Sequence, residues 1–258
     1  MIDLAGRGVL LTGTRRIGAV VAKRLAREGA VLALAYRSSR TEAELLANEV
    51  SAGGHGVALL QGDLTVEADV VHLLGAARAA LGGLFGIVHM ASGFSAAPLD
   101  SLDLATWERD MADARSSFLL AAHGSRLLRE GAGETAGGQT RGHIVFCTDW
   151  AAGATPYRGF LPYLTAKASV DFMTRAFAVE LAPHGILVNA VAPGPMRRPV
   201  DMAPAEWTTL VQNDTPLTRE SSPDDLAEMV VTLLRAETIT GEIIRIDSGR
   251  HLAGSGAS

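Results

Sequence analysis

The sequence predicts one α/β domain with a doubly wound sheet, on the basis of three observations. Short apolar segments alternate along the chain with longer segments whose apolar residues recur at helical spacing. The first apolar segment ends in Thr12-Gly13, which is typical of a strand that turns into a helix. Of the 258 residues, 48% are hydrophobic and 20% are charged, which is enough for a substantial buried core. We therefore expect a single domain over residues 1–258, with helices on both faces of a parallel sheet.

The strands are expected where short runs are almost wholly apolar, as in strands that are buried on both faces. These runs are Val9–Leu11, Ala30–Ala35, Val57–Leu60, Phe85–His89, His143–Cys147, Ile186–Val191 and Glu242–Ile246. The segments of helical period between them are Ile17–Arg27, Thr41–Ser51, Ala68–Leu81, Leu104–Glu130, Thr165–Leu181 and Pro223–Arg235. Strands that are separated by helices pair in parallel through right-handed crossovers, so this order predicts a parallel seven-stranded sheet.

The stretch Gly131–Gly142 is the most glycine-rich and polar part of the chain. It lies between an expected helix and an expected strand, which favours a flexible surface loop. A hinge between two domains is the alternative.

The charge balance and the cysteine count narrow the class of protein. The net charge is −5 and the pI is about 5.8, and no large basic cluster offsets them, which argues against a nucleic-acid partner. Cys147 is the only cysteine, which suits a reducing cytoplasm. The first residues lack the apolar core of a signal peptide, and no apolar run reaches the length of a membrane span. We expect a cytoplasmic protein that binds neither nucleic acid nor membrane, and no residue spacing resembles a metal site.

The turn after the first strand predicts a dinucleotide site. Glycines permit a tight turn there, and the helix that follows offers free N–H groups to a pyrophosphate. The turn has two glycines rather than the usual three, so its position between strand and helix carries the prediction. The expected cofactor-binding residues of the turn are Gly13, Thr14, Arg15, Arg16, Ile17 and Gly18.

The end of the second strand indicates which dinucleotide is preferred. A site for NAD carries Asp or Glu there, about 20 residues after the glycine turn, to accept from the ribose 2′-hydroxyl. This chain has Tyr36, Arg37 and Ser38 instead, followed by Arg40. Two guanidinium groups close to the place of a 2′-phosphate predict NADPH as the cofactor. The alternative is that both arginines are merely solvated.

Tyr163 and Lys167 form the strongest catalytic candidate. They lie four residues apart at the start of an expected helix, so both side chains fall on one face of it. Lys167 is one of only two lysines in the chain. A phenol with a pKa near 10 is a poor acid at neutral pH, and a neighbouring ammonium group lowers that pKa.

With these motifs the chain resembles the short-chain dehydrogenase/reductase family, from Arg7 to Leu252. The resemblance implies a Rossmann domain, a nicotinamide cofactor, and a homotetramer or homodimer. The Thr-Gly…Ile-Gly turn is similar to the family's cofactor loop, one residue shorter than usual, and the segments 189–194 and 240–249 resemble its later signatures. The further cofactor-binding residues that the resemblance implies are Asp63, Leu64, Ala91, Ser92, Pro193, Gly194 and Met196, together with Tyr163 and Lys167.

Two residues depart from the family pattern. Asp149 stands where the family has a serine, and Asp113 or Ala114 takes the place of an asparagine on the long helix. Aspartate at the serine position resembles the pteridine reductase branch, which also has an arginine where Arg16 stands. In that branch a phenylalanine, here Phe94, stacks the substrate ring against the nicotinamide.

The expected substrate residues are Phe94, Asp149, Trp150, Tyr157 and Arg197. Each has a simpler interpretation: Phe94 as a lid or core aromatic, Asp149 as a turn cap, and Trp150 and Tyr157 as packing within their loop. Arg197 either attracts an anionic substrate or is only solvated.

Together these features predict an NADPH-dependent oxidoreductase that transfers hydride to a C=N or C=O group of a small molecule. Tyr163 would supply the proton, Lys167 would lower its pKa, and Asp149 would orient or protonate the substrate, with Asp113 as the fourth catalytic candidate. A pteridine-reductase-like enzyme is the first hypothesis. The alternatives are a general carbonyl or 3-oxoacyl reductase, and an inactive protein that binds NADPH as a sensor.

Overall fold

The computed structural model describes the chain except residues 55, 131–138, 200–201 and 254–258. Its centre is a seven-stranded sheet in the order β3-β2-β1-β4-β5-β6-β7, in which every neighbouring pair is parallel. The strands are β1 (Gly8–Thr12), β2 (Val31–Tyr36), β3 (Val57–Gln61), β4 (Gly86–His89), β5 (Gly142–Cys147), β6 (Ile186–Pro193) and β7 (Ile243–Ile246). The predicted parallel seven-stranded sheet is confirmed.

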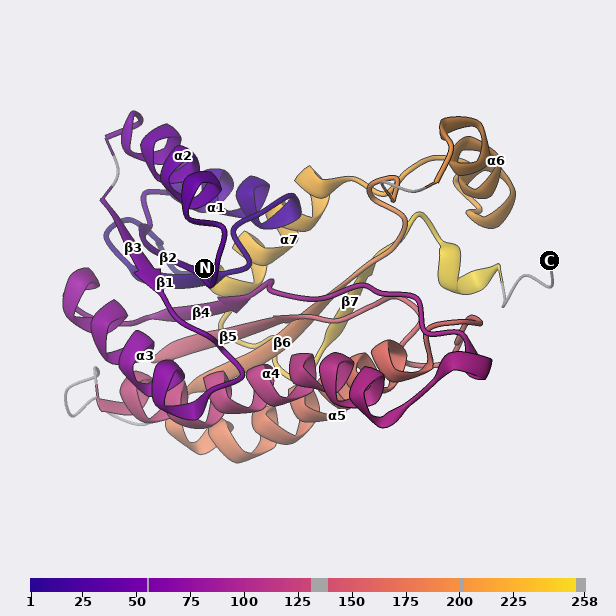
Figure 1. Cartoon of the computed structure of the whole chain (residues 1–258). Coiled ribbons are helices and arrows are strands. Elements are labelled where there is room, and N and C mark those ends of the chain that lie inside the picture. Colours follow the sequence, from indigo (N-terminus) through magenta and orange to yellow (C-terminus); the bar gives the residue numbers. More distant parts are fainter. Residues whose placement is uncertain (55, 131–138, 200–201, 254–258) are drawn as a thin grey trace.

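Helices cover both faces of this sheet (Figure 1). One face carries α1 (Ile17–Arg27), α2 (Arg40–Ser51) and α7 (Pro223–Arg235), and the other carries α3 (Glu67–Leu81), α4 (Leu104–Glu130) and α5 (Leu161–Leu181). Each face has its own apolar core: Leu25 and Val230 belong to the first, and Leu120 and Val170 to the second. A strand that is packed on both faces must be apolar on both faces, which explains the uninterrupted apolar runs of the sequence.

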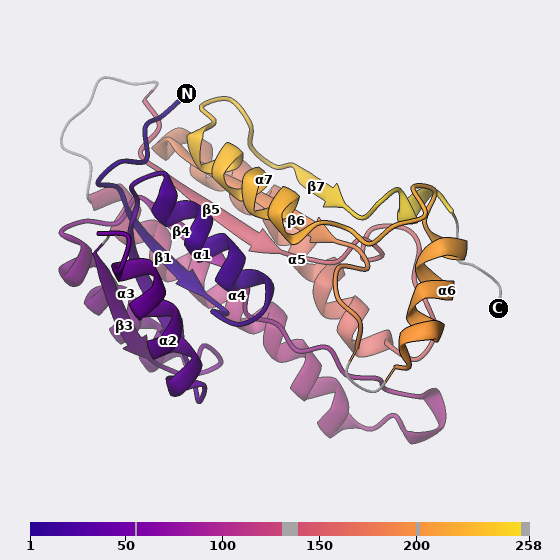
Figure 2. The ribbon, with the colours of Figure 1, turned by 90° about the horizontal axis from the view of Figure 1, so that it is seen from above.

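One helix was missed and one was predicted too short. Helix α6 (Pro204–Asp214) lies beyond the sheet near the C-terminal part of the chain (Figure 2). It buries only Trp207 and Val211, so its apolar periodicity is too weak to stand out in the sequence. Helix α5 begins at Leu161 rather than at Thr165, with Pro162 in its first turn, where a missing N–H costs nothing.

The glycine-rich stretch is only partly described. Gly142 belongs to β5, which corrects the predicted end of the loop, and residues 131–138 lie outside the described part of the chain. No helix of the described residues is long and apolar enough to cross a membrane.

The strand order identifies the edge of the sheet where a ligand is expected. The chain goes outward from β1 through β2 to β3, then returns to β4 on the other side of β1. In such sheets ligands bind at the carboxyl ends of the strands, where the order reverses. The turns after β1, β4, β5 and β6 meet at that edge, and they carry most of the residues that the sequence singled out.

Candidate active site

The turn between β1 and α1 is packed against the segment that follows β4. A Cβ atom on Gly13 would overlap the backbone nitrogen of Ala91, and one on Gly18 would overlap the carbonyl oxygen of Gly13. Both glycines are therefore required by the close approach of backbone to backbone. Arg16, at the N-cap of α1, has φ 51° and ψ −111°, a conformation that residues with side chains rarely adopt.

The residues after β2 lie in an exposed, charged setting. A guanidinium nitrogen of Arg37 is 3.8 Å from a carboxylate oxygen of Asp63, and Arg40 forms an ion pair with Glu44 at 2.8 Å. Asp63 also accepts from the amide and the hydroxyl of Thr65, and these bonds hold the pKa of its carboxyl below the ordinary value. Arg40 thus has a partner on its own helix, whereas Arg37 faces Asp63 in the segment after β3.

Tyr163 and Asp149 form a buried pair. The phenol of Tyr163 donates a hydrogen bond of 2.9 Å to Oδ2 of Asp149, whose Oδ1 accepts from the amide of Ala151 at 2.9 Å. Burial raises the pKa of the Asp149 carboxyl above its ordinary value, although both hydrogen bonds act in the opposite direction. Burial, reinforced by the charge of Asp149, also raises the pKa of the Tyr163 phenol well above its ordinary value. Near neutral pH the phenol therefore keeps its proton.

This direction differs from the expectation that Lys167 lowers the pKa of Tyr163. The lysine Nζ lies 5.8 Å from the centre of the tyrosine ring and is occupied elsewhere. It donates to the carbonyl of Cys147 at 2.9 Å and lies 3.5 Å from Oδ2 of Asp113. In this arrangement burial and the nearer carboxylate outweigh the ammonium group.

Asp113, and not Ala114, lies beside Lys167. Its carboxylate accepts from the hydroxyl of Ser92 at 2.7 Å and from the amide of Gly93 at 3.4 Å. Asp113 therefore ties helix α4 to the segment after β4, and it places a carboxylate beside the ammonium group of Lys167. Lys167 itself is 2% exposed.

Aromatic rings line one side of Tyr163. Phe94 lies edge-on to Tyr163, with ring centres 5.1 Å apart, and it stacks on Phe160 at 4.6 Å with an interplanar angle of 16°. Trp150 stacks on Tyr157 at 5.8 Å, and Tyr157 in turn meets Phe160 edge-on. The expected substrate residues Phe94, Trp150 and Tyr157 are thus in one cluster, although Phe94 keeps about half of its surface exposed.

Sequence reasoning missed Phe160 and Arg250 in this cluster. The guanidinium of Arg250 lies 4.9 Å above the ring of Trp150, and it forms an ion pair with Asp214 at the end of α6 at 3.0 Å. Phe160 lies three residues before Tyr163, so proximity in the chain was a usable signal for it. Nothing in the sequence brings Arg250 next to Trp150.

The loop after β6 lies at the edge of the same region. The carbonyl of Pro193 accepts from the amide of Trp150 at 3.3 Å, the amide of Gly194 donates to Ile246, and Met196 is buried. Arg197 is exposed, and it takes part in none of the ion pairs found in the described part of the chain.

His89, the last residue of β4, lies beneath this region. It is buried, its Nδ1 is 2.6 Å from the hydroxyl of Thr12, and its Nε2 is 3.1 Å from the hydroxyl of Ser116. Burial lowers its pKa to about 4, so the ring is neutral near pH 7. The uncharged ring links β1, β4 and α4 by hydrogen bonds.

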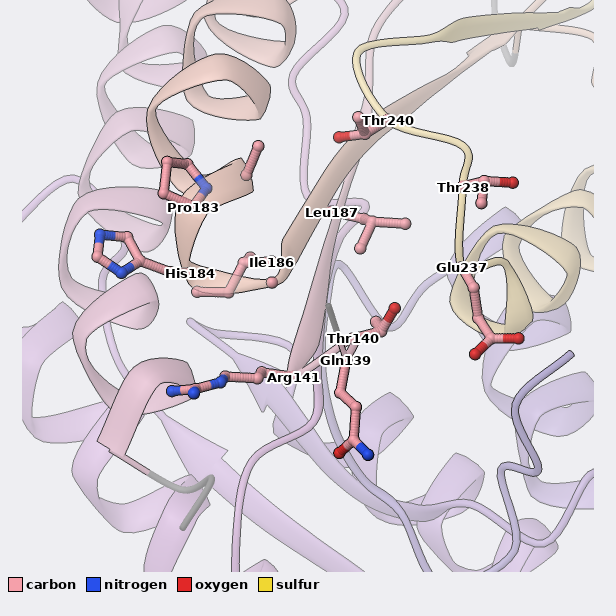
Figure 3. Close-up of a pocket in the computed structure, with 12 residues that line it drawn as sticks. Gln139, Thr140, Arg141, Pro183, His184, Ile186, Leu187, Glu237, Thr238 and Thr240 are labelled. Atoms are coloured by element: carbon pink, nitrogen blue, oxygen red, sulfur yellow. The ribbon is translucent and has the colours of Figure 1, made fainter. Parts of the chain in front are cut away.

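A separate pocket lies at the opposite end of the strands (Figure 3). It has a volume of about 250 Å³, and it is bounded by residues that precede or begin β5 and β6, including Arg141, His184 and Ile186. Glu237 lies across the pocket from His184 (Figure 3). None of the expected site residues lines it, so it is distinct from the candidate active site.

Comparisons with known proteins agree with this picture. A family model described as "Enoyl-(Acyl carrier protein) reductase" matches residues 12–251. The chain is 32% identical to glucose 1-dehydrogenase of Gluconobacter oxydans, covering 97% of this chain and 94% of that protein. It is 28% identical to 3beta-hydroxysteroid dehydrogenase 1 of Eggerthella lenta, with 97% and 95% covered. The crystal structure of FolM alternative dihydrofolate reductase 1 from Brucella canis, complexed with NADP, is similar with a TM-score of 0.86 and 30% identity, covering 97% and 96% of the two chains.

Proposed function

The chain belongs to the short-chain dehydrogenase/reductase family and is an oxidoreductase, and we propose that it is an NADPH-dependent reductase of C=N groups in flat heterocycles. The observation that carries the proposal is the buried hydrogen bond between Tyr163 and Asp149, with Lys167 beside them at the carboxyl ends of β4 and β5. The phenol keeps its proton at neutral pH, and although its raised pKa makes it a weak acid, it can give that proton to the strongly basic atom that hydride transfer would leave on the substrate.

The residues of the β1–α1 turn fit a dinucleotide. Gly13 and Gly18 permit the tight backbone packing of the turn, and no side chain caps the start of α1, whose N–H groups suit the charge of a pyrophosphate. Arg16 and Arg37 are exposed near that turn and would favour the 2′-phosphate of NADPH over the free hydroxyl of NADH. The NADP that is bound in the Brucella canis protein supports this choice.

The remaining contacts to the cofactor follow from the same arrangement. When bound, NADPH would supply the hydride, and the protein would position it and provide the proton. The residues proposed to hold it, besides those of the turn, are Tyr36, Arg37, Ser38, Asp63, Leu64, Ala91, Ser92, Tyr163, Lys167, Pro193, Gly194 and Met196.

Each polar residue of the pair and its surroundings has a proposed task. Tyr163 donates its proton to the substrate, and Asp149 holds the phenol in place or supplies the proton that replaces it. Lys167 is fixed by the carbonyl of Cys147 and by Asp113, which keeps its charge close to the reacting groups. The burial of Tyr163 and Asp149 excludes water and strengthens these interactions.

The carboxyl of Asp149 favours a nitrogen heterocycle over a ketone. A ketone that accepts hydride develops negative charge on oxygen, and a carboxylate beside that oxygen opposes it. A ring nitrogen is instead basic enough to be protonated before its C=N bond accepts hydride. A buried carboxyl group with a raised pKa can supply that proton, and the carboxylate left behind stabilises the cationic ring. The exposed ring of Phe94 offers a flat surface for such a ring.

A general carbonyl or 3-oxoacyl reductase is the second candidate. The names of the two related dehydrogenases favour it, since they refer to hydroxysteroid and glucose substrates and to no nitrogen heterocycle. Membership of an oxidoreductase family speaks against the inactive NADPH sensor.

Self-association is a further part of the proposal. Leu161, Phe172 and Val179 lie along one side of α5 and are 51–75% exposed, and Phe118 of α4 is 50% exposed. Apolar side chains grouped on adjacent helices are typical of an interface. We expect a homodimer or homotetramer that covers them.

The experiment that tests the function measures NADPH consumption with dihydropterins, quinones and acyl thioesters as substrates. Turnover of a dihydropterin or quinonoid ring supports the first candidate. Turnover of acyl ketones alone supports the second.

A further inference from the structure

Three residues of α5 that lie one turn apart face the carboxyl end of β5. Tyr163 donates to Asp149, and Lys167 donates to the carbonyl of Cys147. Asp171 is the third, one turn beyond Lys167, and the chemistry proposed above does not use it. It is only 5% exposed, which is unusual for an aspartate unless its carboxyl has partners.

The partner of Asp171 is Thr148. The threonine Oγ1 lies 2.6 Å from Oδ1 of Asp171 and 3.1 Å from the carbonyl oxygen of Lys167, and Thr148 is 1% exposed. The consecutive residues 147, 148 and 149 are thus each bonded to α5. A hydrogen bond from a hydroxyl to a carboxyl group is among the stronger kinds, and at 2.6 Å the middle contact is the shortest of the three.

The carboxyl group of Asp171 lies in a region that also contains positive charge. A Cβ atom on Gly153 would lie 3.1 Å from a terminal nitrogen of Arg245 and 3.6 Å from Oδ2 of Asp171, so both groups approach the same small space. Burial raises the pKa of Asp171, while the Thr148 hydroxyl and the charges of Arg175 and Arg245 act against that rise. One oxygen of Asp171 therefore faces Thr148, and the charges of Arg175 and Arg245 act on the carboxyl group from farther away.

We propose that Asp171 is a positioning residue. It acts through Thr148 to hold the carboxyl end of β5 against α5, so that Asp149 and the carbonyl of Cys147 stay within hydrogen-bond distance of Tyr163 and Lys167. Thr148 lies between Cys147 and Asp149 in the chain, so a shift of Thr148 moves the acceptor of Lys167 and the acceptor of Tyr163 together. Displacements of about 1 Å in a reacting group can cost about 100-fold in rate. The proposal rests on the proposed function, in which Tyr163 and Lys167 carry out the proton chemistry.

Replacement of the threonine tests the link. Thr148→Val keeps the shape and removes the hydroxyl, and Thr148→Ser keeps the hydroxyl. The matched control is Thr174→Val, because Thr174 is also buried, lies on α5, and donates within its own helix to the carbonyl of Val170 at 2.8 Å. With the most active substrate of the panel, Thr148→Val should lose about 10- to 100-fold in kcat, with less than about threefold change in NADPH affinity. Thr148→Ser and Thr174→Val should stay within about threefold of the wild-type kcat.

Replacement of the aspartate tests whether the effect of Thr148 on kcat depends on the carboxyl group of Asp171. Asp171→Asn keeps an acceptor for Thr148 and should retain most of kcat, whereas Asp171→Ala should resemble Thr148→Val. If Asp171→Ala does not fold, the comparison of kcat in Thr148→Val and Thr174→Val still tests the proposal. Equal kcat in those two valine variants, at equal losses of Tm, overturns the proposal.

A crystal structure of Thr148→Val gives a readout that needs no substrate. The proposal expects the Cys147–Lys167 and Asp149–Tyr163 hydrogen bonds to be lengthened or lost. If both bonds keep their lengths, Asp171 does not position the site. A Tyr163→Phe variant that retains full activity would instead contradict the proposed function, and would leave the structural result to decide the role of Asp171.

Discussion

Arg16 stands where the turn between β1 and α1 requires a backbone conformation that suits glycine. Its φ of 51° and ψ of −111° cost a residue with a side chain roughly 1–3 kcal/mol. In Arg16→Gly that strain is relieved, while the added freedom of glycine in the unfolded chain takes back roughly 0.5–1 kcal/mol. The variant should therefore be more stable by about 1 kcal/mol, which raises the Tm of a chain of this size by about 2 °C.

The same variant should bind NADPH more weakly. The Arg16 side chain is exposed beside the phosphate turn, and it takes part in no ion pair found among the described residues. A charge-assisted contact to a phosphate contributes roughly 1.5–3 kcal/mol, so its loss should raise the Kd for NADPH about 10- to 100-fold. A gain of stability together with a loss of NADPH affinity would show that the strained backbone at Arg16 places its side chain for cofactor binding.

The assay combines thermal unfolding with a titration of NADPH fluorescence. Thr218→Gly is the matched control, because Thr218 also has a positive φ, of 50°, outside the phosphate turn. Thr218→Gly should also raise the Tm, because it relieves a positive φ, and it should leave the Kd for NADPH unchanged. An unchanged Kd in Arg16→Gly would refute the assignment of this arginine to the cofactor.

Three further predictions concern the cofactor, the proton donor and the core. The wild-type protein should bind NADPH at least about tenfold more tightly than NADH, and Arg37→Asp should erase or reverse that preference in the same titration; equal Kd values in the wild type would contradict it. Tyr163→Phe should lose turnover while it still binds NADPH, and a residual kcat above a few percent would show that another group is the acid. His143 is fully buried, neither ring nitrogen has a hydrogen-bond partner among the described residues, and burial lowers its pKa to about 4. The contribution of the neutral His143 ring to the free energy of unfolding is therefore fully present above about pH 6.5 and is lost as the pH falls toward about 4. Between about pH 7 and about pH 5 the free energy of unfolding should fall by about 2 kcal/mol from this source. Denaturant unfolding should show that this part of the pH dependence disappears in His143→Leu; an unchanged pH dependence would exclude His143 as its source.

The sheet and most helices could be predicted because burial on both faces leaves a direct trace in the sequence. The run at Ile186–Val191 is an example, since β6 differs from it only by two added residues, Ala192 and Pro193. Helix α6 could not be predicted, because only two of its side chains are buried and its apolar pattern is weak. Local periodicity reports what packs against the core, and α6 packs mostly outside it.

The candidate site was predictable to the extent that its residues stand in known motifs. Tyr163, Lys167 and Asp149 could be grouped from spacing and resemblance, and they do lie together. The hydrogen bond of Thr148 to Asp171 and the stacking of Arg250 on Trp150 could not be found in this way. Both join residues that are far apart in the chain, and only the packing of the folded protein decides which distant side chains meet.

The direction in which the Tyr163 pKa is shifted is the clearest difference between the sequence-based prediction and the structure. The sequence places an ammonium group one helical turn away, which predicts a lower pKa. In the structure Lys167 is committed to Cys147 and Asp113, while Asp149 accepts directly from the phenol. Distance and desolvation therefore decide the sign, and neither can be obtained from residue spacing.

The ratio of heterocycle reduction to carbonyl reduction, in the wild type and in Asp149→Ser, tests the central claim most directly. A serine at position 149 removes the carboxyl group from Tyr163 but keeps a hydroxyl. We expect heterocycle reduction to fall about 100-fold, as is usual when one acid–base group is removed, while carbonyl reduction is kept or improved. The ratio should therefore fall by at least about 100-fold. An unchanged ratio, or a wild-type protein that reduces acyl ketones and no heterocycle, would contradict the claim and favour a general carbonyl reductase.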